Sequence, residues 1–189
     1  GEAEFLGGGD LARALRHIEL AIDGFRELGD DASLNLFGLG IAAAICVRQG
    51  DLERAEAYAV EAATLPGPGW RATALIILGG WVLHARGELL RAHNLVLRGS
   101  EQAREMSLEP WARHGCLMLA RIAADRGEAE TAARLFGAAT PQPPWGSDPH
   151  WWTPRDSVAA SLGSSKFEAL VHTGATTPLA DVLASLDLS

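Results

Sequence analysis

Two stretches of the sequence partly match nucleotide-binding motifs, but both matches are poor. The only lysine, Lys166, follows Ser165, whereas a phosphate-binding loop needs a glycine directly before its lysine. Gly38-x-Gly40-x-x-Ala43 has the spacing of a dinucleotide-binding fingerprint, but that fingerprint follows a β-strand and this stretch lies inside a predicted helix. We therefore expect no nucleotide cofactor and assign these small residues to helix packing.

The histidines and cysteines do not fall into catalytic or metal-binding patterns. Six histidines occur without an H-E-x-x-H motif or close His/Cys spacing, and the sequence has no G-x-S-x-G nucleophile motif. Cys46 and Cys116 lie in apolar stretches without C-x-x-C spacing, which is typical of buried thiols in a reducing compartment. We therefore predict a protein that is not an enzyme and that holds no metal.

The charge and the apolar content of the sequence indicate which classes of partner the protein does not bind. A net charge of −8 argues against binding to nucleic acid, because that affinity rests on Lys and Arg side chains that neutralise phosphates. The longest apolar run, from Ala72 to Leu83, is shorter than the roughly 20 residues that a membrane span needs, and no signal-peptide pattern opens the sequence. We expect a soluble, cytoplasmic protein that binds neither nucleic acid nor membrane.

A short motif comes four times and organises the chain. Glycine is followed by an acidic residue and, five positions on, by alanine, and the glycines are Gly9, Gly50, Gly87 and Gly127, a period of about 40 residues that is typical of repeat proteins. The glycine can end one helix in the left-handed conformation, and the acidic residue can cap the next. The small residues would let paired helices approach closely, which predicts a stack of helical hairpins. The alanines are Ala14, Ala55, Ala92 and Ala132.

The helical periodicity of apolar residues and the helix-breaking residues predict where the helices lie. Apolar residues recur at helical spacing over 10–28, 33–49, 51–65, 70–86, 88–106, 110–126 and 128–139. We expect Ser33 to cap the second of these helices and Ser165-x-x-Glu168 to form a capping box in the tail. The predicted organisation is repeats over 1–139 with the first one truncated, a Pro/Trp-rich linker over 140–153, and short helices over 154–189 that pack on the last repeat.

The repeat resembles the tetratricopeptide pattern, with each glycine at the turn between the two helices of a repeat. Its longer period resembles the sensor region of MalT-like, LuxR-type bacterial transcriptional regulators, which carry a STAND-class ATPase. The segment Ala133-Arg134-Leu135-Phe136-Gly137-Ala138-Ala139 and the later Arg155…Leu162-Gly163, Phe167, Gly174 and Thr177 are similar to that family's C-terminal segments. The linker replaces much of a longer helix that the family carries.

The resemblance implies an all-α tetratricopeptide-like superhelix, an α-solenoid, that acts as a non-catalytic protein- or effector-binding sensor module of such a regulator and docks on its ATPase domain. Two alternatives stay open. One is a tetratricopeptide adaptor in another signalling protein, such as a kinase or cyclase, and the other is an enzyme with an unrecognised site.

The resemblance also places a candidate binding site, because the first helix of each tetratricopeptide hairpin lines the concave face. An indole, two imidazoles and guanidinium groups there would suit an acidic or aromatic peptide or a small anionic effector. The alternative is that Trp81 belongs to the core and that the polar groups only solvate the surface. The residues that the register puts on this face are Arg48, Trp81, His84, His114, Arg121 and Asp125.

Three indoles in the linker form a second candidate. Trp145, Trp151 and Trp152 are costly to leave in water. They either pack against the last hairpin or form a patch that contacts a protein partner, since tryptophan is favoured at binding hot spots.

Overall fold

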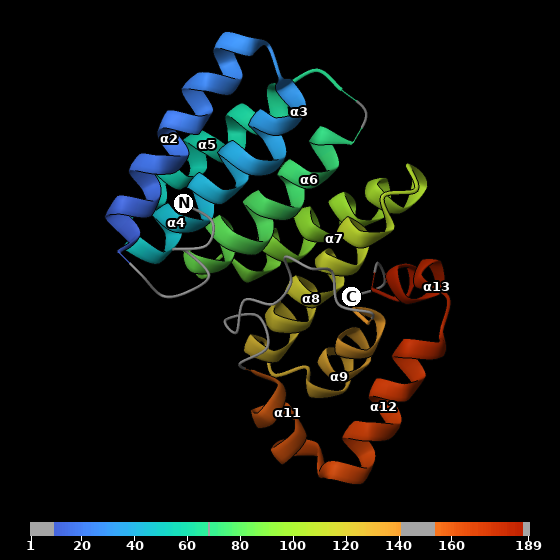
Figure 1. Ribbon diagram of the computed structural model, residues 1–189. Helices are drawn as coiled ribbons and strands as arrows, with labels where there is room; N and C mark the ends of the chain where they lie inside the picture. Colours follow the sequence, from blue (N-terminus) through green and yellow to red (C-terminus); the bar gives the residue numbers. More distant parts are fainter. Residues whose placement is uncertain (1–9, 68, 141–153, 187–189) are drawn as a thin grey trace.

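The computed structural model of the chain describes residues 10–67, 69–140 and 154–186, and every regular element in them is a helix (Figure 1). The predicted all-α class is confirmed. The elements are α2 (Leu11–Leu28), α3 (Asp31–Ser33), η1 (Leu34–Leu39), α4 (Gly40–Gln49), α5 (Leu52–Thr64), α6 (Trp70–Ile77), η2 (Leu78–Leu83), α7 (Leu89–Glu105), α8 (Glu109–Asp125), α9 (Ala129–Ala138), α11 (Pro154–Leu162), α12 (Ser164–Thr176) and α13 (Leu179–Ala184).

Helices that follow one another in the chain pack side by side. Contacts run from α2 to α4 and then in order through α5, α6, α7, α8 and α9, while α12 lies against α9 (Figure 1). Two stretches are π-helix. The first, η1, continues directly into α4, and the second, η2, ends at Leu83, directly before His84. The core is therefore built mainly between helices that are neighbours in the chain.

Glycines end the first helix of each described pair. Gly50, Gly87 and Gly127 have φ values of 79°, 74° and 81°, a left-handed conformation that a residue with a Cβ atom adopts only at a cost. The amide of Gly50 donates to the carbonyl of Val47 at 3.0 Å, which satisfies one of the last carbonyls of α4. Gly9 lies outside the described residues.

The acidic residues after the glycines cap helices only where they are aspartates. Asp10 accepts hydrogen bonds from the amides of Ala12 and Arg13 at 2.9 and 3.1 Å, and Asp51 accepts one from Arg54 at 3.1 Å. Glu88 and Glu128 stand at the same position without a side-chain cap. Their longer side chains form ion pairs instead, with Arg91 and Arg126 respectively.

Two of the predicted caps are wrong. The helical stretch after α2 is capped by Asp30, whose carboxylate accepts from the amide of Ser33 at 3.0 Å, so Ser33 is already inside the helix. In the tail, Gly163 has φ of 80° and turns the chain directly into α12, which begins at Ser164 and has no side-chain cap. The predicted N-cap, Ser165, therefore lies two residues after the observed one, Gly163.

Small residues mark the closest helix crossings. Ala55 and Ala92 are fully buried, as predicted. A Cβ atom placed on Gly79 would lie 2.9 Å from the carbonyl oxygen of Ala92, so α7 leaves no room for a side chain there. Gly137 on α9 and Gly174 on α12 likewise face backbone of the opposite helix, which brings the tail tightly onto α9.

A buried hydrogen-bonded pair joins three helices. Asn35 of η1 is fully buried and donates from Nδ2 to the carbonyl of Ala62 at 3.0 Å. Thr73 of α6 donates from Oγ1 to Asn35 Oδ1 at 3.0 Å. Because buried polar groups must be paired, these bonds fix the end of α5 between η1 and α6.

One described helix is long and apolar enough to cross a membrane by length and composition. It covers 31–49, has 19 residues and a mean hydropathy of 1.3, and 59% of its most apolar window is buried inside the protein. Helices α2 and α5 pack against this stretch, and a core helix passes the same test, so this is weak evidence for a membrane span.

Candidate functional site

Three of the residues predicted for the concave face lie together. His84, just after η2, contacts Asp125 of α8, with 2.7 Å between His84 Nε2 and Asp125 Oδ2. Arg121, one turn earlier on α8, donates from Nε to the same oxygen at 3.0 Å. The exposed side-chain fractions are 10% for His84, 20% for Arg121 and 35% for Asp125. We call these three residues the His84 cluster.

The carboxylate holds the His84 cluster together. Burial by itself would raise the pKa of Asp125, but hydrogen bonds from His84 and Arg121, helped by the Arg121 charge, outweigh it and hold this pKa below its usual value. Asp125 is therefore ionised at neutral pH. It takes the place that a ligand anion would occupy between the imidazole and the guanidinium, so an acidic ligand must share Arg121 with Asp125 or displace it.

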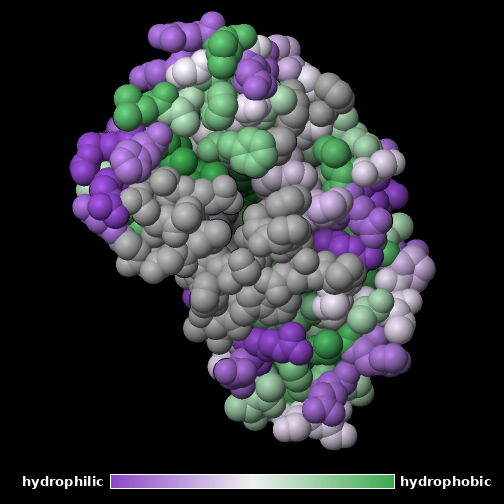
Figure 2. Space-filling model, viewed as in Figure 1, coloured by the Kyte–Doolittle hydropathy of each residue, from purple (hydrophilic) through white to green (hydrophobic). Residues whose placement is uncertain are grey.

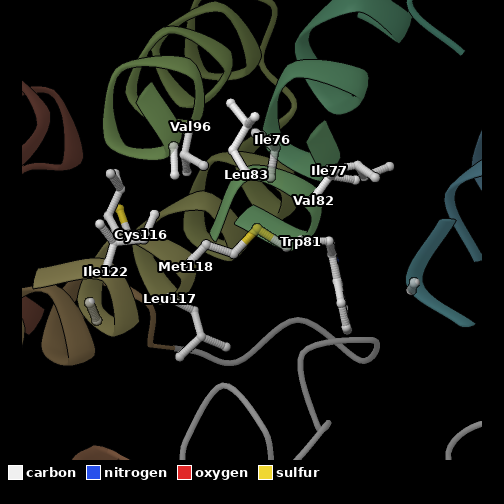
Figure 3. Close-up of a cluster of buried hydrophobic side chains, with 14 of the residues drawn as sticks. Ile76, Ile77, Trp81, Val82, Leu83, Val96, Cys116, Leu117, Met118 and Ile122 are labelled. Atoms are coloured by element: carbon white, nitrogen blue, oxygen red, sulfur yellow. The ribbon is translucent and has the colours of Figure 1, made fainter. Parts of the chain in front are cut away.

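Trp81 and His114 lie in the interior. Trp81 is 8% exposed and belongs to the main hydrophobic cluster, where it comes from the same helical stretch as Val82 and Leu83 (Figure 3). His114 is 4% exposed, and its ring stands edge-on to Trp111 at 5.8 Å. Burial lowers the pKa of His114 to about 4, and its Nδ1 has no hydrogen-bond partner. Both rings are therefore part of the packed interior.

The remaining predicted site residues lie apart or outside the described chain. Arg48 is exposed in the last turn of α4. Trp145, Trp151 and Trp152 lie outside the described residues. The candidate site that the described residues support is therefore smaller than the one that the register predicted, and it is centred on the contact between His84 and α8.

Sequence reasoning missed Arg113, which ties α8 to the end of α9. Its Nη1 donates to the carbonyls of Ala138 and Thr140 at 2.8 and 2.6 Å, and its Nη2 donates to Glu109 at 2.6 Å. The spacing of Glu109 and Arg113 by one helical turn was readable from the sequence. The carbonyl contacts were not, because they join residues that are distant in the chain.

The described residues include a cleft beside the last helices but no cluster of metal ligands. Among residues 10–67, 69–140 and 154–186, no group of three or more His, Cys, Asp or Glu side chains could hold a metal ion. A cleft of about 290 Å³ lies between α9, α12 and α13 and is lined by polar and apolar residues, including Arg134 and Asp181. The arginine there already pairs with Glu130 at 3.4 Å.

Comparison with known proteins does not assign the chain to a family. It matches no protein-family model, no curated protein and no solved structure. What the protein does must therefore be argued from the residues themselves.

Proposed function

We propose that the protein is a non-catalytic helical-repeat module that binds a protein or peptide partner, or a small anionic effector, at the His84 cluster. The observation that carries the proposal is the bond between His84 and Asp125 at 2.7 Å. It joins the ends of two successive first helices of the hairpin stack and holds partly exposed polar groups in one geometry. Such preorganisation lowers the entropy that binding must overcome.

The chemistry of the cluster favours a ligand with a carboxylate. The guanidinium of Arg121 offers donors in a planar fork that matches a carboxylate in a bidentate manner. Asp125 engages the guanidinium through Nε and so fixes its orientation. A peptide with an acidic side chain or a free C-terminus is the class of ligand that we favour.

The test uses random dodecapeptides displayed on phage and selected on the immobilised protein. For the peptides that bind, Arg121→Ala should weaken binding by roughly 1–3 kcal/mol, as expected for a hot-spot residue, with little change in melting temperature. Arg91→Ala is the matched control, since Arg91 is an exposed arginine that pairs with Glu88 of its own helical turn. Peptides that bind the Arg121 variant as tightly as the wild type would place recognition elsewhere.

The finer assignment rests on sequence resemblance. We propose that this tetratricopeptide-like module is the sensor region of a cytoplasmic LuxR-type regulator, and that a ligand shifts how it docks on the ATPase domain. The segment Ala133–Ala139 and the later Gly163, Phe167 and Gly174 support this. The adaptor of a kinase or cyclase is the second candidate. The sequence that flanks this segment in its gene distinguishes the two candidates. A P-loop upstream and a helix-turn-helix downstream favour the regulator, and a kinase or cyclase domain favours the adaptor.

A further inference from the structure

The cleft between the C-terminal helices and α9 is a second candidate site, separate from the His84 cluster. It has a volume of about 290 Å³ and lies between α9, α12 and α13, at the lower right of the ribbon in Figure 1. Leu135, Val182 and Leu186 line it with apolar side chains, while Arg134 and Asp181 line it with charged ones. This volume is at the lower limit of the range of ligand sites, so the cleft has room only for a small molecule.

The walls of the cleft are held in place by close contacts. A Cβ atom on Gly137 of α9 would overlap a carbonyl oxygen of α12, and one on Gly174 of α12 would overlap that of Arg134, so these two helices pack backbone against backbone. The third wall, α13, is held where the buried ring of His93 on α7 hydrogen-bonds the backbone of Leu186, which follows α13. A cleft with fixed walls is preorganised, which reduces the entropy that a ligand loses on binding.

The two charged residues of the cleft have few partners within the described chain. The Arg134 side chain makes its one hydrogen bond to a described residue through Nη2, to Glu130 at 3.4 Å, and Lys166 holds that carboxylate more closely, at 2.6 Å. The Asp181 carboxylate forms no hydrogen bond or ion pair with the described residues. Arg134 and Asp181 therefore line one cleft with opposite charges and do not pair with each other, which leaves both groups available to a ligand.

This pair of charges selects the class of ligand. A phosphate or a dicarboxylate would be attracted by Arg134 and repelled by Asp181, and a simple amine would meet the reverse. A zwitterion satisfies both groups, because its carboxylate accepts from the guanidinium fork and its ammonium donates to the carboxylate. The apolar residues Leu135, Val182 and Leu186 suit an aliphatic side chain.

The surface around the C-terminal helices fits a small ligand better than a large partner. On the face of the molecule in Figure 2, the described hydrophilic and hydrophobic side chains are mixed over these helices. They form no large apolar patch of the kind that marks a protein-docking surface. The recognition chemistry of this region is therefore that of the cleft itself.

We propose that this cleft binds a free aliphatic α-amino acid, with leucine as its representative. Arg134 binds the α-carboxylate, Asp181 binds the α-ammonium group, and the apolar residues of the cleft contact the side chain. The site goes beyond the proposed function, because it shares no residue with the His84 cluster and takes a ligand of different charge. A ligand held by both charges bridges α9 and α13, so its binding stabilises the packing of the C-terminal helices.

Isothermal titration calorimetry of the whole chain with L-leucine, leucinamide and N-acetylleucine tests the two charge contacts separately. Leucinamide lacks the carboxylate and N-acetylleucine lacks the ammonium group, so each should bind the wild type at least tenfold more weakly than leucine, a difference of about 1.4 kcal/mol. Arg134→Gln should lose the preference for leucine over leucinamide and keep the preference over N-acetylleucine, and Asp181→Asn should do the converse. A merely structural role for either residue would weaken all three ligands together, and that result would overturn the proposal.

Both substitutions are at exposed positions, so the variants should fold, and circular dichroism checks their helical content. The matched control is Arg104→Gln on α7, at an exposed arginine outside the cleft that lies 4.0 Å from Glu105, and it should bind leucine as the wild type does. A wild-type chain that binds no leucine up to millimolar concentration, or an Arg104→Gln variant as impaired as Arg134→Gln, would refute the assignment. Peptides that bind through Arg121 would in that case leave the proposed function standing.

Discussion

Acid should destabilise this protein through His114. Burial lowers the pKa of His114 to about 4, against about 6.5 in an unfolded chain. Between these two values the unfolded state binds a proton that the folded state does not, so the stability present above pH 6.5 is lost as the pH falls toward 4. The full difference is worth about 3 kcal/mol of unfolding free energy, of which about 2 kcal/mol are lost between pH 7 and pH 5.

Urea unfolding of the wild type and of His114→Leu at a series of pH values measures this term. Leucine is similar in volume, and it forfeits no bond at Nδ1, which has no partner in the native state. The wild type should lose about 2 kcal/mol more than the variant between pH 7 and pH 5. Burial and the nearby Arg126 also lower the pKa of His93, but that contribution is common to both proteins and cancels in the difference. Free energies that fall in parallel would refute the argument.

Three further outcomes follow from burial. Ala92→Leu should cost about 1–3 kcal/mol in urea melts, because Gly79 already packs against the Ala92 backbone, and an unchanged midpoint would contradict this contact. Trp81→Ala should cost roughly 3–5 kcal/mol of stability, and a variant as stable as the wild type would mean that the indole is not core. Burial raises the pKa of Cys46 to about 11 and that of Cys116 to about 12, so both thiols should react with a thiol reagent only as fast as the protein unfolds; rapid labelling of the native protein would contradict their burial.

The parts of the fold that could be predicted from the sequence are those where one residue type alone satisfies a local constraint. Left-handed turns at Gly50 and Gly87 require glycine, so their positions are visible without a structure. The caps were less predictable because they depend on side-chain length. Asp51 accepts a hydrogen bond from one amide of its own helix, that of Arg54, whereas Glu88, one methylene longer, pairs with an arginine instead. Both positions show the same sequence pattern, an acidic residue directly after a glycine, so the sequence alone does not distinguish them.

The candidate site was harder to predict because repeat position does not determine exposure. The residues six positions before successive turn glycines are Ala44, Trp81 and Arg121. The first two are buried at 4% and 8%, while the Arg121 side chain is 20% exposed and pairs with Asp125. Because the three residues share one position in the repeat, their spacing predicts the same role for all of them. A charged side chain, however, is stable only where it keeps a partner and some contact with water.

The contact that brings the His84 cluster together shows where these helices can present polar groups. His84 and Asp125 both lie within the last turn of a first helix, three residues before Gly87 and two before Gly127. The middle of the same helices is apolar, with Ile76, Met118 and Leu119 buried. Because the helices end near the turns, charged side chains at these positions can contact one another and still remain partly exposed to solvent. In the described helices, charged side chains such as His84, Arg121 and Asp125 therefore lie near the ends of the first helices, and the middles of these helices serve the core.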